Sequence, residues 1–402
     1  MSALLIVWLL TDLVATYGVW HFWRHLVPLE PAADTPQAVV LVAIKDASVT
    51  TAPFLDSLWR QQYPDYRVVF ALESAADPAL RLIEPLQHKD TGGPALDIVI
   101  AGCATRRAQK VHNLLAALQR LRDEDRIVVF ADADTLLHPD WLTDLIRPVA
   151  TGEAAASTGY RWPLPVDSRL PTLIGAAADL SITTSARSRH WNVCWGGSTA
   201  VKREALDLID LPLAWDRASS DDVTLTQALR ARKLLINSPL RVLVPSPVAH
   251  TWSSLFSFAR RQHLMVRIYA PGHWLFGGFT LFVPAIGAGL AIAQLAYGSR
   301  FAACVLLASI AMLQMRSRLR RQIAMRILPP DALAAAHATI RFASWAWPLV
   351  HLAHCIVFLS SCVGRRFTWA GIGYRLDGRD VLVTARPAPG PGALDDGPRN
   401  GR

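Results

Sequence analysis

IVVFADAD, residues 127–134, is the stretch that decides the fold. Its first five residues are apolar and mostly β-branched or aromatic, which is typical of a strand buried inside a sheet. Two carboxylates, Asp132 and Asp134, follow at the end of that strand, and carboxylate oxygens suit a divalent cation such as Mg²⁺ or Mn²⁺. An ordinary acidic loop after a strand would look the same, so the pair alone leaves both interpretations open.

Three more short apolar runs precede this one, and helical patterns separate most of the four. The predicted strands are Ala38–Ile44, Arg67–Leu72, Asp97–Ala101 and Ile127–Ala131, and the predicted helices are Pro53–Gln62, Pro78–Gln87 and Ala108–Arg122. This alternation predicts an α/β fold with a Rossmann-like, mostly parallel sheet, whose ligands bind at the carboxyl ends of the strands. The side chains at or just after those ends are Glu73, Ser74, Arg106, Lys110, Asp132 and Asp134.

The composition predicts a membrane protein. Hydrophobic residues make up 52% of the 402 residues and charged residues only 18%, which is too apolar for a wholly soluble chain of this size. Residues Ala3–Trp23 are long enough to cross a bilayer, with Asp12 as the one charge inside. A cleavable signal peptide fits less well, because no basic segment precedes the apolar run and no small-residue cleavage site follows it.

The C-terminal third supplies further apolar segments, Leu275–Tyr297, Phe301–Met315 and Phe342–Val363. The second is short, and we expect it to be tilted, re-entrant or tightly paired with the first. The net charge is +9, with arginines clustered beside these segments. Such clusters indicate cytoplasmic flanks and contacts with anionic lipids rather than nucleic acid. A single span at 342–363 would put the last cluster outside, so that segment is re-entrant or breaks the charge rule.

These features divide the chain into five parts. They are an N-terminal anchor (1–27), a catalytic α/β domain (38–250), an amphipathic interfacial helix (251–270), a C-terminal transmembrane region (271–365) and a basic tail (366–402). The tail is Pro/Gly-rich from Arg386 onward, which predicts disorder there. The five cysteines show no spacing typical of disulfides or zinc, which agrees with a catalytic domain on the cytoplasmic side of a bacterial inner membrane.

A second acidic pair, Asp221-Asp222, lies at the start of the helix predicted over Ser220–Arg232. Ser219 or Ser220 is expected to cap this helix, and acids near its N-terminus are favoured by the helix dipole. Capping accounts for one of the two carboxylates. The other can serve as a general base; our choice is Asp222, with Asp221 as the fallback.

Three other segments have both a functional and a plain structural interpretation. Lys110 opens an apolar helix and could contact a nucleotide, but a solvated lysine on an amphipathic helix is the simpler prediction. The turn Gly196-Gly197-Ser198 permits close approach of the backbone or is an ordinary turn. Ser253–Tyr269 is an amphipathic helix expected at the membrane interface, where it could place Arg261 and His263 near a diphosphate and an acceptor headgroup.

The order of these segments resembles the membrane-bound family 2-type glycosyltransferases with a GT-A fold, most closely the ceramide glucosyltransferase family and its bacterial relatives. The segments are Lys110-x-x-Asn113, Asp132-x-Asp134, Gly196-Gly197-Ser198, Ser220-Asp221-Asp222 and the basic helix, all ahead of the C-terminal apolar segments. The resemblance covers about residues 39–269, and Ala76-Asp77-Pro78-Ala79 matches the family's acidic Asp-Pro segment.

The resemblance implies a role for each matching residue. Asp132 and Asp134 match the metal-binding acids, Asp222 matches the base, and Lys110 and Asn113 match a segment near the nucleotide. The family's first aspartate, which reads the nucleobase, falls near Glu73-Ser74, where Glu73 is the possible substitute. The family's Gln-or-Arg-x-x-Arg-Trp pattern belongs within residues 260–267, where no Arg-Trp pair occurs.

The function implied is inverting transfer of a sugar, glucose from UDP-glucose in the nearest family, to the hydroxyl of a membrane lipid such as ceramide. The expected partners are a nucleotide sugar, a lipid acceptor and the membrane, with no nucleic acid, and the expected cofactor is Mg²⁺ or Mn²⁺. The alternatives are a polysaccharide synthase, a transferase acting on polyprenyl phosphate, and a catalytically weakened membrane scaffold.

Overall fold

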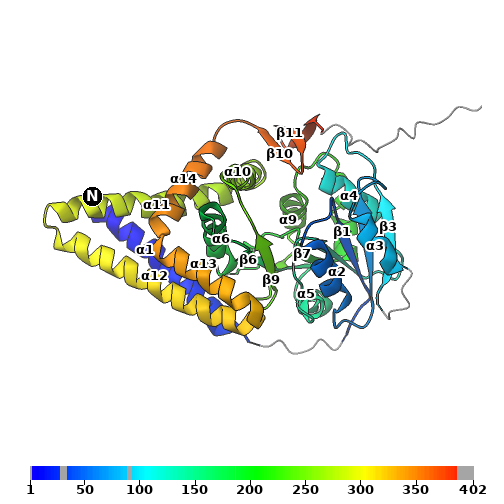
Figure 1. Cartoon of the computed structure of the whole chain (residues 1–402), viewed down its shortest axis with the longest axis horizontal. Helices are drawn as coiled ribbons and strands as arrows, with labels where there is room; N and C mark the ends of the chain where they lie inside the picture. The colour runs from blue at the N-terminus through cyan, green and yellow to red at the C-terminus, as the bar shows by residue number, and fades with distance from the viewer. Residues whose placement is uncertain (1, 28–33, 88–92, 186, 387–402) are drawn as a thin grey trace, which may run out of the picture.

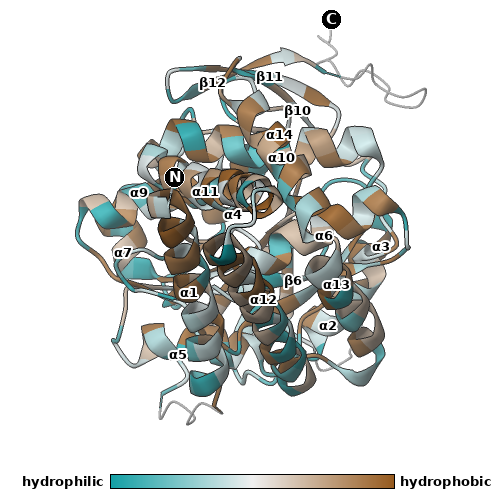
Figure 2. Ribbon diagram, turned by 90° about the vertical axis from the view of Figure 1, so that its left-hand side faces the viewer, coloured by the Kyte–Doolittle hydropathy of each residue, from teal (hydrophilic) through white to brown (hydrophobic). Residues whose placement is uncertain are grey.

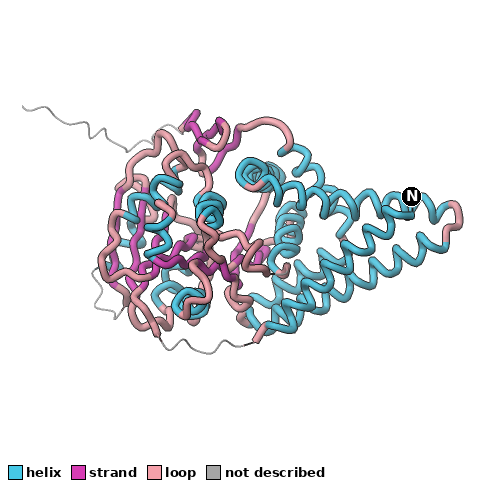
Figure 3. Tube along the Cα trace, turned by 180° about the vertical axis from the view of Figure 1, so that it is seen from behind, coloured by secondary structure: helices cyan, strands magenta, loops and turns pink. Residues whose placement is uncertain are grey.

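The computed structural model describes residues 2–27, 34–87, 93–185 and 187–386. A rounded α/β part carries the sheet, and a bundle of long helices projects from one side of it (Figure 1). Seen from behind, the strands gather in one half of the molecule and the projecting half is helical (Figure 3).

The central sheet has seven strands in the order β3-β2-β1-β4-β7-β5-β8. Strands β1 to β4 run parallel, whereas β7 is antiparallel to both β4 and β5. The seven strands are β1 (Ala38–Ala43), β2 (Tyr66–Leu72), β3 (Ala95–Ile100), β4 (Ile127–Asp132), β5 (Ala156–Thr158), β7 (Ser198–Lys202) and β8 (Ile236–Asn237). A separate parallel pair joins β6 (Tyr160–Pro165) to β9 (Leu243–Val248).

Alternate side chains of each central strand enter separate cores. In β1, Val39 and Leu41 face one core, and Val40 and Val42 face the other. The first core is completed by α4 (Gln109–Leu118), α9 (Asp221–Ala231) and α10 (Trp252–Tyr269), and the second by α2 (Thr51–Trp59), α3 (Leu80–Gln87) and α5 (Trp141–Ala150). Because both faces are covered, the inner strands β1 and β4 are buried and almost entirely apolar, as the sequence predicts. The remaining helices of this part are α6 (Leu170–Thr183), α7 (Arg203–Leu208) and α8 (Leu211–Ala214).

Three described helices are long and apolar enough to cross a membrane: α1 (Ser2–His25), α11 (Pro271–Ala296) and α12 (Arg300–Ile327). Figure 2 shows their apolar colouring, most plainly along α1 and the near part of α12. Asp12 of α1 is buried against α12, where its carboxylate pairs with Arg316 at 3.0 Å. An ion pair between neighbouring helices explains how a charged residue is tolerated inside an apolar segment.

Two expectations for the C-terminal segments change. The segment predicted as Phe301–Met315 is part of a 28-residue helix, α12, that continues through the arginine cluster, so its predicted shortness is wrong. The segment predicted as Phe342–Val363 is not one straight span. It belongs to α13 (Leu333–Trp345) and α14 (Trp347–Ser361), and the pair of helices is bent by 86°. This bend is that of a broken span or of a re-entrant loop.

The first part of the predicted tail forms a small antiparallel sheet that the sequence analysis does not foresee. Its strands are β10 (Arg366–Trp369), β11 (Ile372–Asp377) and β12 (Asp380–Ala385). Tyr374 is buried in the core formed with α4, and its hydroxyl accepts the Gln109 N–H at 3.2 Å. The sheet therefore packs on the α/β domain near α4 and α10 (Figure 1). The predicted disorder is wrong for Arg386, which makes several contacts, and residues 387–402 lie outside the described part.

Candidate active site

A cavity of about 610 Å³ opens at the carboxyl ends of β1 and β4. Ala43 and Asp132, the last residues of these two strands, lie opposite each other in the sheet register, and both line the cavity. The site is therefore placed where a doubly wound sheet binds its ligands. Of the predicted site residues, those lining this cavity are Lys110, Asn113, Asp132, Asp134, Asp221, Asp222, Arg261 and His263.

Lys110 joins the two acidic pairs. Its ammonium Nζ lies 2.7 Å from Asp132 Oδ1 and 2.9 Å from Asp221 Oδ2. Only 14% of the Lys110 side chain is exposed, so the expectation of a solvated lysine is wrong. An opposite charge on each side offsets the cost of burying the ammonium group. Gly196 permits this arrangement, since a Cβ atom there would lie 2.2 Å from Asp221 Oδ2 and 2.8 Å from Lys110 Nζ.

The two aspartates in the first turn of α9 have different contacts. Ser220 is the N-cap, and its hydroxyl oxygen accepts the Val223 N–H at 3.4 Å. Asp222 Oδ1 accepts the same N–H at 2.6 Å and also the Ser220 hydroxyl. Asp221 instead faces Lys110, whereas Asp222 Oδ2 has no protein partner among the described residues. Asp222 therefore presents an unpaired oxygen to the cavity, as a general base requires.

Burial changes the protonation of two of these acids. It raises the pKa of Asp221 to about 6, with the Lys110 ammonium acting in the opposite direction. Burial and then the neighbouring Asp132 raise the pKa of Asp134, and Arg161 lowers it. Both shifts report carboxylates crowded into a site with little water.

Asp221 should make stability depend on pH. Its pKa is higher in the folded protein, about 6, than the ordinary 3.8, so the folded state binds the proton more tightly. By linkage, the stability it contributes is present below pH 3.8 and is lost as the pH rises to about 6. We expect the difference in melting temperature, Asp221→Asn minus wild type, to increase as the pH rises through this window. Thermal unfolding in detergent from pH 4 to 8 tests this, and a difference that falls with pH would contradict it.

The amphipathic helix α10 brings Arg261 and His263 to the cavity. The Arg261 guanidinium lies 4.5 Å from the ring centre of Trp369 and 5.6 Å from that of Phe258. Burial lowers its pKa to about 10, and Arg261 has no ion pair with a described carboxylate. It is therefore a partly buried cation, beside two aromatic rings, that is available to an anionic ligand. Arg161, which the sequence analysis does not single out, also lines the cavity and pairs with Asp179 at 2.5 Å.

Asn113 lines the cavity and Ser74 does not, and both make structural contacts. The Asn113 amide donates to Ala71 O at 3.3 Å and accepts from Gln109 Nε2 at 2.8 Å, which ties α4 to the end of β2. Ser74 Oγ accepts the Ala76 N–H at 3.1 Å in the turn after β2. In the same turn, Asp77 accepts the Asp46 N–H at 3.1 Å. The Asp-Pro segment therefore orders the loops beside the cavity.

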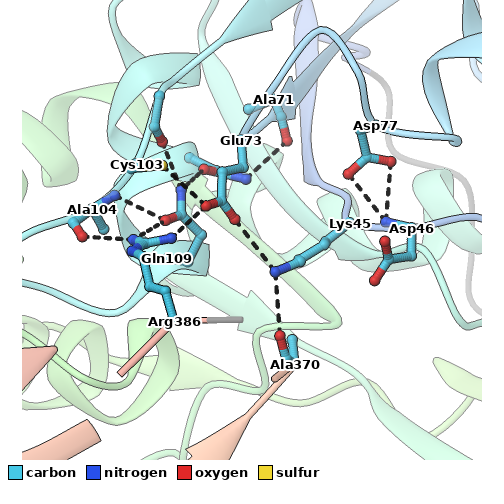
Figure 4. Close-up of polar contacts among 12 residues, drawn as sticks. Lys45, Asp46, Ala71, Glu73, Asp77, Cys103, Ala104, Gln109, Ala370 and Arg386 are labelled. Carbon is cyan, nitrogen blue, oxygen red and sulfur yellow. Dashed lines mark hydrogen bonds and ion pairs between the residues drawn. The ribbon is translucent and has the colours of Figure 1, made fainter. Parts of the chain in front are cut away.

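Glu73 does not line the cavity and belongs instead to a polar network that links the sheet to the C-terminal strands (Figure 4). Its carboxylate pairs with Lys45 at 3.4 Å and with Arg386, and accepts from Cys103 Sγ at 3.3 Å. Arg386 also donates to Ala104 O at 2.6 Å, while Lys45 donates to Ala370 O at 3.2 Å. Glu73 thus fastens the small C-terminal sheet over the end of β2. Lys45 and Arg386 are network residues that the sequence analysis misses.

Replacing Glu73 with glutamine should destabilise the protein by about 1–3 kcal/mol, because two cations would lose their shared partner. The Glu73 side chain is only 14% exposed, so water compensates for little of this loss. Thermal unfolding of the purified protein in detergent measures it. Glu84→Gln is the matched control, since Glu84 is exposed on α3 and has no ion pair with a described residue. Equal melting temperatures for the two variants would contradict the fastening role.

The carboxylates suit a divalent cation that arrives with a phosphate ligand. Lys110 pairs with Asp132 Oδ1, so Asp132 Oδ2 and the Asp134 carboxylate remain as oxygen ligands for a metal ion in the cavity. No group of three or more histidine, cysteine, aspartate or glutamate side chains suited to a metal occurs in the described part of the chain. Mg²⁺-type ions are often held by one or two carboxylates with phosphate oxygens completing the shell, which agrees with this donor set.

Comparison with known proteins gives the family. The sequence pattern of glycosyl transferase family 21 matches residues 3–381, which include the anchor, the α/β domain and the C-terminal helices. The chain belongs to glycosyl transferase family 21. This family 21 protein is thus a glycosyltransferase, and its α/β architecture is the GT-A fold that the sequence predicts.

Solved structures and curated relatives show more distant similarities. A mannosyltransferase from Pyrobaculum calidifontis, in complex with GDP-Man and Mn²⁺, is 17% identical with a TM-score of 0.45, over 89% of this chain and 99% of that one. S. aureus TarS with UDP-GlcNAc is 11% identical with a TM-score of 0.38, over 87% and 100% of the two chains. A threonylcarbamoyl-AMP synthase of Xylella fastidiosa (strain M12) is 35% identical over 129 residues, 28% of this chain and 68% of that protein. That partial match leaves the assignment over residues 3–381 unchanged.

Proposed function

We propose that this family 21 glycosyltransferase moves a sugar from a nucleoside-diphosphate sugar to the hydroxyl of a membrane lipid, with inversion at the anomeric carbon. The supporting observation is Asp222, whose free oxygen faces the same cavity as Asp132 and Asp134. The solved mannosyltransferase in complex with GDP-Man and Mn²⁺ is a transferase of the same general chemistry. UDP-glucose and ceramide are the donor and acceptor that the family resemblance implies.

Asp222 would act as the base. Its Oδ2 takes the proton of the lipid hydroxyl while the hydroxyl oxygen forms a bond to the anomeric carbon. The bond from that carbon to the diphosphate oxygen breaks on the opposite face, and the nucleoside diphosphate leaves with the electron pair. The Asp222 carboxylate is oriented by the Ser220 hydroxyl and the Val223 N–H, both of which hold Oδ1.

The diphosphate would be held by charge. Asp132 and Asp134 would hold a divalent cation, Mg²⁺ or Mn²⁺, whose chemistry is to neutralise the departing diphosphate. Arg261 adds a positive charge that no described carboxylate neutralises, and it lies on a rigid helix within the cavity. Preorganised charge of this kind stabilises the negative charge that develops on the leaving group.

The acceptor would approach from the membrane side. Beyond the acids, the cavity is walled by apolar side chains of α6, α10 and α14, and α14 belongs to the bent helix pair. A lipid chain can remain in apolar surroundings there while its hydroxyl reaches Asp222. This arrangement favours a lipid acceptor over a soluble sugar or a growing polysaccharide.

Titration of the purified protein with UDP, with and without Mn²⁺, tests the donor site. We expect Mn²⁺-dependent binding in the wild type and at least about tenfold weaker binding in Asp132→Ala, because one of the two carboxylates proposed to hold the metal is lost. Asp207→Ala is the control, since Asp207 is exposed on α7. If the wild type binds UDP equally well without metal, the proposed metal site is wrong. If it does not bind UDP at all, the result favours a catalytically weakened scaffold. Lipid profiling of a deletion strain would then identify donor and acceptor together.

A further inference from the structure

The small C-terminal sheet reaches the cavity through one tight turn. Ala370 and Gly371 connect β10 to β11, and Trp369 is paired with Ile372 across the turn. Both turn residues have a positive φ, 48° at Ala370 and 78° at Gly371, as a type I′ hairpin turn requires. A positive φ is unusual for alanine, and such conformations cluster at functional sites. Trp369 and Ala370 both line the cavity.

This turn contacts two elements of the cavity wall. Just past the end of β1, Lys45 Nζ donates to Ala370 O at 3.2 Å (Figure 4). On α10, the Arg261 guanidinium lies 4.5 Å from the ring centre of Trp369. Lys45 and Arg261 also line the cavity. The turn therefore joins the first strand of the sheet to the amphipathic helix at the site itself.

The contacts of the C-terminal sheet fix the position of Trp369. At the start of β10, Arg260 of α10 donates to Arg366 O at 2.8 Å. At the start of β12, Asp380 pairs with Arg217 at 3.1 Å. The polar network of Figure 4 holds the chain just past the end of β12. A ring on a sheet that is fastened at several points is suited to orient a neighbouring side chain.

Arg261 is a side chain that needs such orientation. Its guanidinium has no hydrogen bond or ion pair with the described residues, and its contacts are with the rings of Phe258 and Trp369. Phe258 is the more distant of the two, at 5.6 Å, and belongs to the same helix. A free arginine loses side-chain entropy when it binds a ligand. A ring that holds the guanidinium beforehand therefore favours binding.

We propose that Trp369 is a positioning residue, which holds the Arg261 guanidinium toward the diphosphate of the donor, so that the C-terminal sheet completes the donor site. This inference rests on the proposed function, because it assumes that the cavity binds a nucleoside diphosphate. The face of an aromatic ring attracts a cation without neutralising it, whereas a carboxylate in the same place would cancel the charge. Arg261 therefore stays available to phosphate oxygens, and Trp369 acts through it.

Binding of UDP and of uridine tests this role. Each is titrated, in the presence of Mn²⁺, into the full chain in detergent micelles. Uridine lacks both phosphates, so the ratio of the two affinities reports the contacts of the diphosphate. Trp369→Leu should lower the wild-type preference for UDP by about three- to tenfold and leave the affinity for uridine unchanged. Trp369→Phe keeps an aromatic face and should retain part of the preference.

Coupling to Arg261 separates positioning from packing. Arg261→Gln alone should lower the preference for UDP. Adding Trp369→Leu should lower it no further, because the ring acts only through the guanidinium. Thr368→Val is the matched control, since Thr368 precedes Trp369 in β10, is exposed and does not line the cavity. It should keep the wild-type preference.

Two results would overturn the positioning role while UDP binding persists. An equal loss of affinity for UDP and uridine in Trp369→Leu would mean that the ring contacts the nucleoside itself. Additive losses from the Trp369 and Arg261 substitutions would mean that the two side chains act independently. Should Trp369→Leu not fold, the partial loss in Trp369→Phe, and its absence in the Arg261→Gln background, provide the same test. A wild type that binds no UDP refutes the proposed function, and this inference with it.

Discussion

Replacing Asp222 with asparagine is expected to lower kcat for sugar transfer by about 10²–10⁴-fold, the usual contribution of a general base. Asparagine has nearly the same shape and can still accept the Val223 N–H that Asp222 Oδ1 accepts at 2.6 Å. It cannot take a proton from the acceptor hydroxyl. Affinity for UDP should stay within about twofold of the wild-type value, because Lys110 contacts Asp132 and Asp221 rather than Asp222.

The measurement combines a turnover assay in micelles with UDP titration of the same preparation. Asp207→Asn controls for loss of a negative charge on the exposed surface, since 65% of the Asp207 side chain is accessible. If Asp222→Asn keeps more than about a tenth of the wild-type kcat, Asp222 is not the base. Asp221 would then be the next candidate, although its carboxylate is paired with Lys110.

The parallel half of the sheet could be predicted because its signal is local. Strands β1, β2 and β4 are mainly runs of β-branched and apolar residues, and burial on both faces requires such runs whatever surrounds them. The three-stranded C-terminal sheet could not be predicted in this way. Its stability depends on contacts with distant segments, such as Tyr374 with Gln109 and Arg386 with Glu73. Those partners are more than two hundred residues away in sequence.

The residues of the site divide in the same way, into those that local sequence predicts and those that depend on distant contacts. Asp132 and Asp134 follow a strand, so their place at the sheet edge could be predicted, and Asp222 lies in a capped first turn as expected. Lys110 was misjudged because the apolar pattern of α4 fixes the helix but not the neighbours of its first turn. Its partners, Asp132 and Asp221, come from β4 and α9. Only the packed fold shows that this lysine is buried between two carboxylates.

Replacing Lys110 with methionine should therefore destabilise the protein by about 3–5 kcal/mol, the usual cost of leaving a buried charge without its partner. Methionine has a similar length, so the main change is loss of the ammonium that lies 2.7 Å from Asp132 and 2.9 Å from Asp221. The side chain of Asp221 is only 8% exposed, so water cannot replace the lysine there. Chemical unfolding in detergent measures the loss.

A double variant separates charge from packing. Lys110→Met combined with Asp221→Asn removes the stranded carboxylate, so it should be more stable than Lys110→Met alone. Lys202→Met is the control for loss of a lysine, because Lys202 has no ion pair with a described residue and lies outside the cavity. If the losses of the two single variants simply add, the charge coupling is absent. Since Asp132 keeps its negative charge in the double variant, we expect recovery to be partial, and full recovery would mean that Asp221 alone requires the lysine.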